Sequence, residues 1–451
     1  MNLYDLLKRP EGKNLEFKRE LSSAERVLST VVAFANTAGG ILLFGVEDKS
    51  HNVVGIPDPL DLEERIANLI SDGIRPRLAP DIEVLPWRKT QVVAVRIYPS
   101  PSRPHYLKAS GVDGGVYLRV GSSNRRADRA MLDEMRRLSH RETFDEQPMP
   151  ELNSEALDFR AASEYFQPVR VMRERDWLTL GMLVDYQGHR RPTTGGILLF
   201  GTEREKWFPD AYLQAGRFRG TDRTDILDTV EFHQSLPQIV EEGIDFVRKY
   251  ESHGIEIHEA RHQERWSIPL PAVREAIINA VVHADYAQRG APIRLSLFDD
   301  RLEVENPGLL PFELTVEDLL QGVSKLRNRV IGRVFKELGL IEQWGSGIGR
   351  MLTACRETGL PAPHFQEVGW HFRVTLFKSQ TAQTAIDAVD NAIRQFLQDG
   401  VGHTTAEIAR ERHLSSRAIR ARLANLVARG MIVAIGSSAR DPQRKYFNAK
   451  P

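Results

Sequence analysis

Hydrophobic and polar positions alternate along the start of the chain with periods that switch between those of helices and strands. Apolar residues recur at helical spacing in AERVLSTVVAFANTA (24–38), and GGILLFGVED (39–48) is typical of a buried strand that enters a turn. QVVAVRIYPSP (91–101) predicts a strand stopped by prolines, and GGVYLRVGSSNRRAD (114–128) predicts a strand that runs into a basic loop. These segments together predict a mixed α/β domain.

Two polar segments are typical of linkers, ETFDEQPMPELN (142–153) and the small-residue run SQTAQTAID (379–387). At 451 residues the chain is too long for one core. We therefore predict a multidomain α/β (α+β) protein with four parts. They are a first domain at 1–141, a mixed α/β connector at 154–262, a third α/β domain at 263–379 and a C-terminal domain at 387–451.

The heptapeptide GGILLFG occurs twice, at 39–45 and at 195–201. Duplication of a larger unit is one explanation. We favour two buried strands that share common strand residues, because the flanking segments do not resemble each other.

The third domain opens with a predicted helix that carries two chemically capable side chains, Glu275 and Asn279. They are four residues apart and therefore share one helix face. A carboxylate can activate a water, and an amide oxygen can ligate Mg²⁺. Downstream, the glycine loop QWGSGIGRM (343–351) would let phosphates approach main-chain N–H groups at a helix start. Taken singly, each feature is equally compatible with a solvated helix face or a tight turn.

The order of these features is more informative than any one of them. The helix REAIINAVVHADY, the turn VENPGLLP and the segment RNRVIGRVFKELGLIEQWGSGIGRM together resemble the GHKL ATPase superfamily. They are most similar to the divergent GHKL branch in bacterial transcriptional regulators related to the helicase RecG. The chain lacks a GxxxxGK[ST] loop, which excludes a motor helicase of the P-loop class.

The GHKL resemblance implies a α/β sandwich that binds ATP with Mg²⁺. Glu275 would be the water-activating base and Asn279 the Mg²⁺ ligand. The other implied nucleotide contacts are Gly308 at the adenine, Gly345, Gly347 and Gly349 at the phosphates, and the lid cations Lys325, Arg327 and Arg329. Asn306 replaces the usual adenine-reading aspartate and lacks its charge, so we expect nucleotide binding with at most weak ATPase activity.

The N-terminal blocks EGKNLEFKRE, AFANTAGGILLFGVEDKS, VVGI and YLRVGSSNRRA resemble, in this order, the Schlafen-type Alba-like domain. The resemblance implies nucleic-acid binding, to DNA or alternatively RNA. The side chains that could hold phosphates are Arg119, Ser122, Ser123, Asn124, Arg125 and Arg126. The alternative for this basic run is a solvated loop.

Schlafen nucleases use a carboxylate cluster, which suggests a second interpretation of the same domain. Glu11, Glu16 and Asp48 would hold one or two divalent metals for nucleotide-licensed cleavage of RNA or DNA, in phage defence for example. The alternative is a structural ion pair between Glu16 and Lys18. Because the chain has one such domain, a homodimer could supply a second.

The C-terminal segment from Thr404 has the sequence logic of a winged helix-turn-helix that enters the DNA major groove. From Asp387 onward it carries 11 basic and 6 acidic residues, a net charge of +5. The candidate DNA contacts are Arg417, Arg420 and Arg422 on the second helix and Arg440, Arg444 and Lys445 on the wing. Protein contacts are the alternative use of such a domain.

Composition limits the remaining classes of function. The chain has 61 basic and 61 acidic residues, and its single cysteine, Cys355, excludes an internal disulfide and a cysteine metal site. We expect a cytoplasmic protein, since no apolar run approaches the roughly 20 residues of a membrane span. The HExxH string at 258–262 alternates like a strand, which argues against zinc. We predict an ATP-binding, DNA-binding, dimeric transcriptional regulator.

Overall fold

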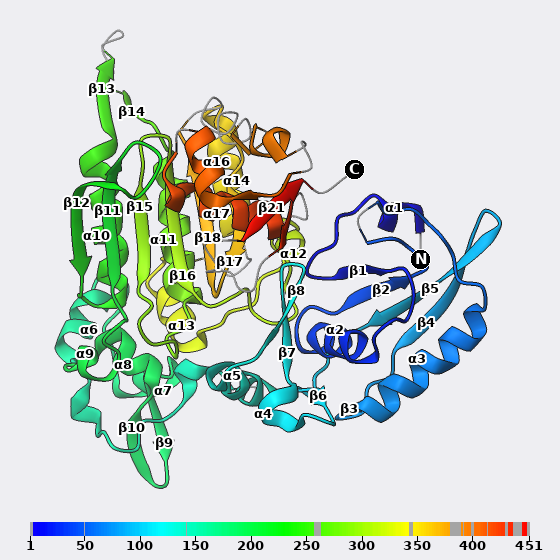
Figure 1. Cartoon of the computed structure of the whole chain (residues 1–451). Helices are drawn as coiled ribbons and strands as arrows, with labels where there is room; N and C mark the ends of the chain where they lie inside the picture. The colour runs from blue at the N-terminus through cyan, green and yellow to red at the C-terminus, as the bar shows by residue number, and fades with distance from the viewer. Residues whose placement is uncertain are drawn as a thin grey trace. The chain divides into compact units, whose positions relative to one another are not determined.

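The computed structural model has a mixed α/β architecture with several sheets, as the sequence predicts, and divides into two compact units (Figure 1). One unit comprises residues 1–139 with 385–451, and the other comprises residues 140–384. The structure describes residues 3–48, 50–140, 142–256, 263–341, 346–378, 389–390, 392–397, 401–412, 414–428, 432–435 and 444–448. Within these ranges, no helix is both long and apolar enough to cross a bilayer.

The N-terminal domain is built on a four-stranded sheet in the order β1-β2-β5-β4. Its strands are β1 (Leu15–Lys18), β2 (Gly40–Phe44), β4 (Asp81–Trp87) and β5 (Thr90–Ile97), of which only β1 and β2 pair in parallel. Two helices, α2 (Ala24–Asn36) and α3 (Pro59–Gly73), bury apolar stripes in a core that includes Phe34 and Ile66. The predicted helix at 24–38 and the predicted strands at 39–48 and 91–101 are thereby confirmed.

Smaller elements complete this domain. They are α1 (Leu3–Leu7), the two-stranded sheet of β3 (Ile74–Arg75) and β6 (Tyr106–Leu107), α4 (Gly111–Gly115), the hairpin of β7 (Tyr117–Val120) and β8 (Ser123–Arg126), and α5 (Arg129–Ser139). The β7–β8 hairpin packs on α2, where Asn36 donates a hydrogen bond of 3.1 Å to the carbonyl oxygen of Tyr117. The basic segment predicted as a loop is instead the second strand of this hairpin, β8, which pairs antiparallel with β7.

The second unit is organised by a six-stranded sheet in the order β12-β11-β15-β16-β18-β17. Its strands are β11 (Leu213–Arg219), β12 (Asp225–Phe232), β15 (Ile293–Leu297), β16 (Arg301–Pro307), β17 (His364–Val368) and β18 (His371–Phe377). β11 and β15 pair in parallel and the other pairs are antiparallel. The predicted connector therefore shares one sheet and one hydrophobic core with the predicted third domain, and the predicted boundary at 262/263 lies inside one compact unit.

The helices α10 (Leu236–Glu251) and α11 (Leu270–His283) pack on the sheet, and α14 (Gly347–Glu357) packs on α11. The other elements of the unit are η1 (Phe144–Glu146), η2 (Ser154–Ala156), α6 (Phe159–Phe166), α7 (Glu174–Thr179), β9 (Leu183–Tyr186), β10 (His189–Pro192), α8 (Thr194–Phe200), α9 (Arg204–Trp207), β13 (Ser252–Glu256), β14 (Gln263–Trp266), α12 (Val316–Leu320) and α13 (Arg329–Glu337). The HExxH string at 258–262 falls outside the described residues.

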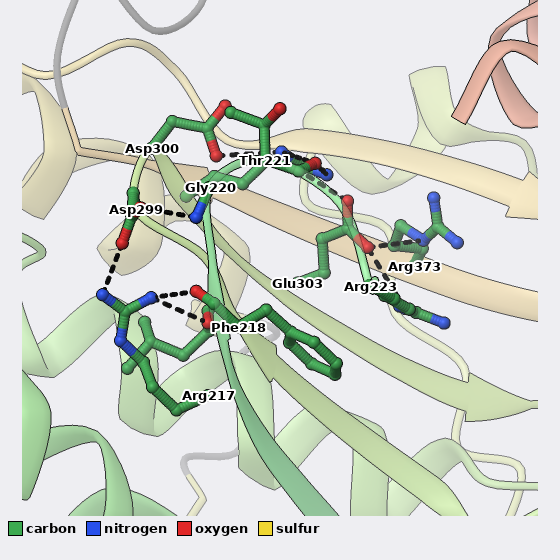
Figure 2. A network of polar contacts seen from close by, with 11 residues as sticks. Arg217, Phe218, Gly220, Thr221, Arg223, Asp299, Asp300, Glu303 and Arg373 are labelled. Carbon is green, nitrogen blue, oxygen red and sulfur yellow. Dashed lines mark hydrogen bonds and ion pairs between the residues drawn. The ribbon is translucent and has the colours of Figure 1, made fainter. Parts of the chain in front are cut away.

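A network of ion pairs stabilises the sheet around Glu303 of β16, as Figure 2 shows. Arg223 and Arg373 lie 3.2 and 3.7 Å from the Glu303 carboxylate, and Arg301 donates to it at 2.8 Å. Burial by itself would raise the pKa of Glu303, but these three guanidinium groups hold it below its usual range. The carboxylate therefore stays charged inside the protein because its partners come from three different segments.

The second copy of GGILLFG corrects the prediction of two buried strands. The first copy forms β2, whereas the second lies in the helix α8. Thr193 caps this helix through its hydroxyl, which accepts a hydrogen bond of 3.0 Å from the Gly196 amide. A Cβ at Gly196 would lie 2.3 Å from the Met182 carbonyl oxygen, so glycine permits this close packing. Every residue of α8 is buried, and a helix that is apolar all round fits such a site.

The carboxylate of Asp145 caps the N-terminus of α13 from a segment that is distant in sequence. It accepts hydrogen bonds from the backbone amides of Arg329, Val330 and Ile331 at 3.0, 2.6 and 3.0 Å. Thr143 donates a further bond of 2.5 Å, and Asp145 is fully buried. The first amides of a helix have no intrahelical partner, so this side chain satisfies three of them at once.

The C-terminal domain contains β19 (His403–Thr404), α16 (Thr405–Glu411), α17 (Ser416–Ala428), β20 (Ile432–Ile435) and β21 (Lys445–Asn448). Its strands form an antiparallel sheet in the order β19-β21-β20. Ile408 of α16 packs with Ile419, Leu423 and Leu426 of α17 in a small core of its own. The sequence predicts helix, turn, helix, helix and β-wing for this domain, and its assignment as a winged helix stays a prediction.

Replacement of Asp145 by alanine is expected to destabilise the unit of residues 140–384 by about 2–4 kcal/mol, because three buried amides lose their acceptor. Denaturant unfolding followed by tryptophan fluorescence measures this, since five of the six tryptophans (all except Trp87) lie in that unit. The control Asp245→Ala removes an exposed ion pair with Arg248 and should cost under about 0.5 kcal/mol. Equal stability of the two variants would contradict the capping role.

Candidate functional site

A cavity of about 360 Å³ lies between α11, α13, α14 and the strands β16 and β18. This volume is within the range of small-molecule sites. The apolar part of its wall includes Val282, Val304, Leu310, Leu314, Val323, Leu326, Ile348, Phe372 and Val374. The polar part is made by Glu275, Asn279, His283, Asn306, Ser324, Lys325, Arg333, Lys336, Ser346 and Arg350.

Three of the predicted nucleotide residues meet in this cavity. A Cβ at Gly347 would lie 2.5 Å from Oε2 of Glu275 and 3.7 Å from Nδ2 of Asn279. The backbone of Gly347 therefore packs directly on the two α11 side chains, and glycine at this position is what permits that approach. The helix and the glycine loop, 72 positions apart between Glu275 and Gly347, form one site.

Glu275 is engaged by an arginine that sequence reasoning did not single out. Nε and Nη2 of Arg350 both donate to Oε1 of Glu275, at 3.0 and 2.6 Å. Nη1 of Arg350 donates to the Ser346 hydroxyl at 2.9 Å. Glu275 is only 5% exposed, so this ion pair compensates a buried charge.

At the turn that ends β16, Asn306 lines the cavity and Gly308 does not. Asn306 lines it, and its Nδ2 donates to the Pro307 carbonyl oxygen at 3.0 Å. Gly308 lies behind it with a φ of +97°, where a Cβ would be 2.9 Å from Cβ of Asp285. Glycine is therefore required by the turn itself. Gly349 has open space around it, and Gly345 falls outside the described residues.

Of the three predicted lid cations, only Lys325 lines the cavity, where it also pairs with Glu313 at 2.8 Å. Arg327 instead donates to the Leu309 carbonyl oxygen at 2.5 Å, and Arg329 pairs with Glu146 at 3.3 Å. Neither arginine lines the cavity, since Arg327 helps to hold the lid and Arg329 helps to hold α13; their contact with the phosphates stays a prediction.

The cavity has two further cations on α13, Arg333 and Lys336, which the sequence prediction missed. Arg333 also pairs with Glu146 at 3.2 Å. A signal for them was present, since Val330, Ile331, Val334 and Phe335 are buried and the helical period places residues 333 and 336 together on the opposite face. With Lys325 and Arg350, these residues make four cations among the described residues that line the cavity.

His283 lines the cavity at the end of α11. Burial lowers its pKa to about 4, with a smaller contribution from the charge of Arg327. Its Nδ1 atom is buried and has no hydrogen-bond partner among the described residues. A neutral imidazole on the same wall as Asn306 can donate or accept a hydrogen bond, which suits the polar edge of a purine base.

The arrangement fits a nucleoside triphosphate with its metal ion. Apolar side chains form a wall for a base, and Lys325, Arg333, Lys336 and Arg350 supply positive charge against Glu275, the one carboxylate among the described lining residues. Asn279, beside Gly347, would hold Mg²⁺ through its amide oxygen.

In the N-terminal domain, the structure removes one residue from the predicted nucleic-acid surface. Arg119 is 1% exposed, and it bonds to the Gly12 carbonyl oxygen, Asn124 and Glu16 at 3.0, 2.8 and 2.6 Å. Its side chain therefore serves the domain interior. Asn124 is half-buried and donates to Thr30 at 2.7 Å. The residues of the predicted set that keep surface exposure are Ser122, Ser123, Asn124, Arg125 and Arg126.

The predicted nuclease cluster does not form a metal site within the described residues. Glu16 is bound by Arg119 and Lys18, which already neutralise it. Glu11 accepts a bond of 2.5 Å from the Phe17 amide, and its pKa is raised to about 8 by burial and by a hydrogen bond to Asp48. The predicted alternative, an ion pair between Glu16 and Lys18, is therefore present, with Arg119 as a second cation partner.

The C-terminal domain keeps some of its predicted DNA contacts at the surface. Arg420 and Lys445 are exposed. Arg422 pairs with Asp390 at 2.9 Å, and the guanidinium of Arg444 lies over the Tyr446 ring at 5.7 Å. The first of these ties α17 to the preceding segment. Arg440 and the side chain of Arg417 fall outside the described residues.

Comparison with solved structures gives two informative neighbours. The DIP2311 protein from Corynebacterium diphtheriae is 21% identical, with 97% of this chain and 92% of that chain covered and a TM-score of 0.45. The N-terminal domain of a RecG-related protein from Nitrosomonas europaea is 30% identical, with 28% of this chain and 92% of that chain covered and a TM-score of 0.22. Comparison with curated proteins gives no match.

Two family models match separate parts of the chain. Residues 11–128 match the family described as "Schlafen, AlbA_2". Residues 290–376 match the family described as "Putative ATP-dependent DNA helicase recG C-terminal", HATPase_c_4, and this range contains Asn306 and the strands β15 to β18. The chain therefore contains a Schlafen AlbA_2 domain, followed by a RecG-related C-terminal HATPase_c_4 domain.

Proposed function

We propose that this protein is an ATP-binding, DNA-binding regulator of transcription, in which the nucleotide site modulates DNA affinity. The observation that carries the proposal is the meeting of Glu275, Asn279 and Gly347 in a cation-lined cavity, in a chain that also has an AlbA_2 domain. The first feature supports a nucleotide ligand and the second a nucleic-acid partner.

The nucleotide enters the cavity with its base against the apolar wall and its phosphates at the glycine loop. Lys336 and Lys325 are the phosphate ligands, since their ammonium groups are compact point charges on flexible stems. Asn279 holds the Mg²⁺ that accompanies the triphosphate. His283 and Asn306 present hydrogen-bonding groups to the base.

Coupling between the sites runs through the segment that joins the two domains. Asp145 caps α13, and the neighbouring Glu146 pairs with Arg333 of the cavity wall at 3.2 Å. Bound phosphates would compete with Glu146 for Arg333, which changes how firmly this segment is held. The nucleotide thereby gains a differential affinity for two arrangements, as any coupling of this kind requires.

Nucleic acid binds at two electropositive surfaces. Arg125 and Arg126 on the β7–β8 hairpin contact backbone phosphates. The C-terminal domain acts as a winged helix, with Arg420 of α17 at the DNA and Lys445 of β21 on the wing. Duplex DNA is the expected partner, because a helix-turn-helix of this order is suited to its major groove.

Asn279→Ala is expected to weaken Mg-ATP binding at least about tenfold, because the metal loses its protein ligand. Isothermal titration calorimetry measures the affinity, and mobility shifts of labelled duplex DNA with and without ATP measure the coupling. The matched control is Asn68→Ala, which changes an exposed asparagine on α3. If Asn279→Ala leaves the ATP dependence of DNA affinity unchanged, the nucleotide does not act through this site.

The double variant Arg125→Ala/Arg126→Ala is expected to lower DNA affinity and to reduce the slope of log affinity against log salt by about 1–2, because up to two phosphate contacts are lost. Arg65→Ala, an exposed arginine on α3, is the matched control. Denaturing gels run beside the native ones report strand cleavage. An unchanged salt slope would place the nucleic-acid surface elsewhere on the chain.

A further inference from the structure

The residue expected to activate water for ATP hydrolysis, Glu275, has one carboxylate oxygen held by a guanidinium. Oε1 accepts two hydrogen bonds from Arg350, at 3.0 and 2.6 Å. Oε2 lies beside the backbone of Gly347, where a Cβ would be 2.5 Å away. A water that used Oε1 as its base would have to displace Arg350.

Hydrolysis of ATP needs a free proton acceptor beside the attacking water. Water must form a bond to the γ-phosphorus while the bond to the β,γ-bridging oxygen breaks, and ADP leaves with that oxygen. A carboxylate oxygen has to accept the water proton in the same step, within about 3 Å. In this pocket a guanidinium holds Oε1 through two hydrogen bonds, and the positive charge of such a pair makes the whole carboxylate a poor proton acceptor.

Arg350 is held in this position by its own helix and by a second hydrogen-bond partner. It lies on the first turn of α14, and its third donor, Nη1, is held by the Ser346 hydroxyl at 2.9 Å. Its side chain is 34% exposed, whereas that of Glu275 is 6% exposed. Withdrawal of Arg350 would leave the Glu275 charge buried without a partner, which is costly. Lys336 and Lys325, the latter paired with the exposed Glu313, also line the cavity wall and can contact phosphates.

We propose that Arg350 is a positioning residue that holds Glu275 away from water, so that the cavity binds ATP and does not turn it over. This inference rests on the proposed nucleotide function and specifies it, since the protein then senses ATP by occupancy. A bound triphosphate persists until it dissociates, and the DNA-binding state follows the cellular ATP concentration.

The test compares ATP binding and phosphate release in the full-length wild-type chain and in Glu275→Gln, Arg350→Gln, Arg350→Lys and the double variant Glu275→Gln/Arg350→Gln. Arg356→Gln is the matched control, because Arg356 is an exposed arginine on the same helix. Thermal unfolding of each variant identifies any that fails to fold.

The wild type is expected to release phosphate no faster than Glu275→Gln, within about twofold. Arg350→Gln is expected to release it at least about tenfold faster, the low end of what a general base contributes. This gain should appear in kcat with KM within about threefold, should be lost in the double variant, and should be largely suppressed in Arg350→Lys, which keeps the charge.

Two results would overturn the inference. One is wild-type turnover more than about tenfold above that of Glu275→Gln, which would make Glu275 an active base; this comparison stands even if Arg350→Gln fails to fold. The other is a folded, ATP-binding Arg350→Gln with no gain in turnover. Failure of the wild type to bind Mg-ATP would instead remove the proposed nucleotide function, and the inference with it.

Discussion

The buried carboxylate of Asp145 is the contact on which the geometry of the candidate site depends. It satisfies three amides at the start of α13. Without an acceptor these amides would be buried donors, and the helix would lose its fixed start. Arg333 and Lys336, one and two turns further on, line the cavity. The segment that follows the N-terminal domain therefore sets the position of two cations in the candidate site, although Asp145 itself is not among the residues that line the cavity.

The six-stranded sheet that carries part of the site likewise depends on segments that are distant in the sequence. Strands β11 and β12 come from the part of the chain that the sequence suggested as a separate connector, yet they extend the sheet that carries Asn306 and Val304. One face of β16 lines the cavity, and the alternate residues Glu303 and Glu305 face arginines on the other side. A strand that is buried on both faces in this way needs internal charge partners, which Arg223 supplies from beyond β11.

Sequence patterns predicted the elements well where a residue's role depends on local spacing. Glu275 and Asn279 share a face because they are four apart on a helix, and they do meet the glycine loop. Local spacing did not decide the second GGILLFG, because its helical state depends on the Thr193 cap and on close contact with Met182. Local spacing also could not predict that Lys325 lines the cavity whereas Arg327 bonds to the Leu309 carbonyl oxygen, because the backbone path of the lid decides where each side chain lies. The helical periodicity of α13 was sufficient to predict that Arg333 and Lys336 share a face, but the prediction relied on the basic lid sequence instead.

Several arginines that the sequence suggests as ligand contacts, together with the cavity residue Arg350, are internal partners of carboxylates. Arg119 pairs with Glu16, Arg329 with Glu146, Arg422 with Asp390 and Arg350 with Glu275. A guanidinium is weakly hydrated and offers five donors, so its desolvation on pairing with a buried carboxylate costs less free energy than that of a lysine ammonium. In a chain with equal numbers of acidic and basic residues, this pairing consumes charge that would otherwise face an anionic ligand. Affinity for phosphate must then come from cations on the cavity wall and at the exposed hairpin, which is why a motif count overestimates the number of contacts and misplaces them.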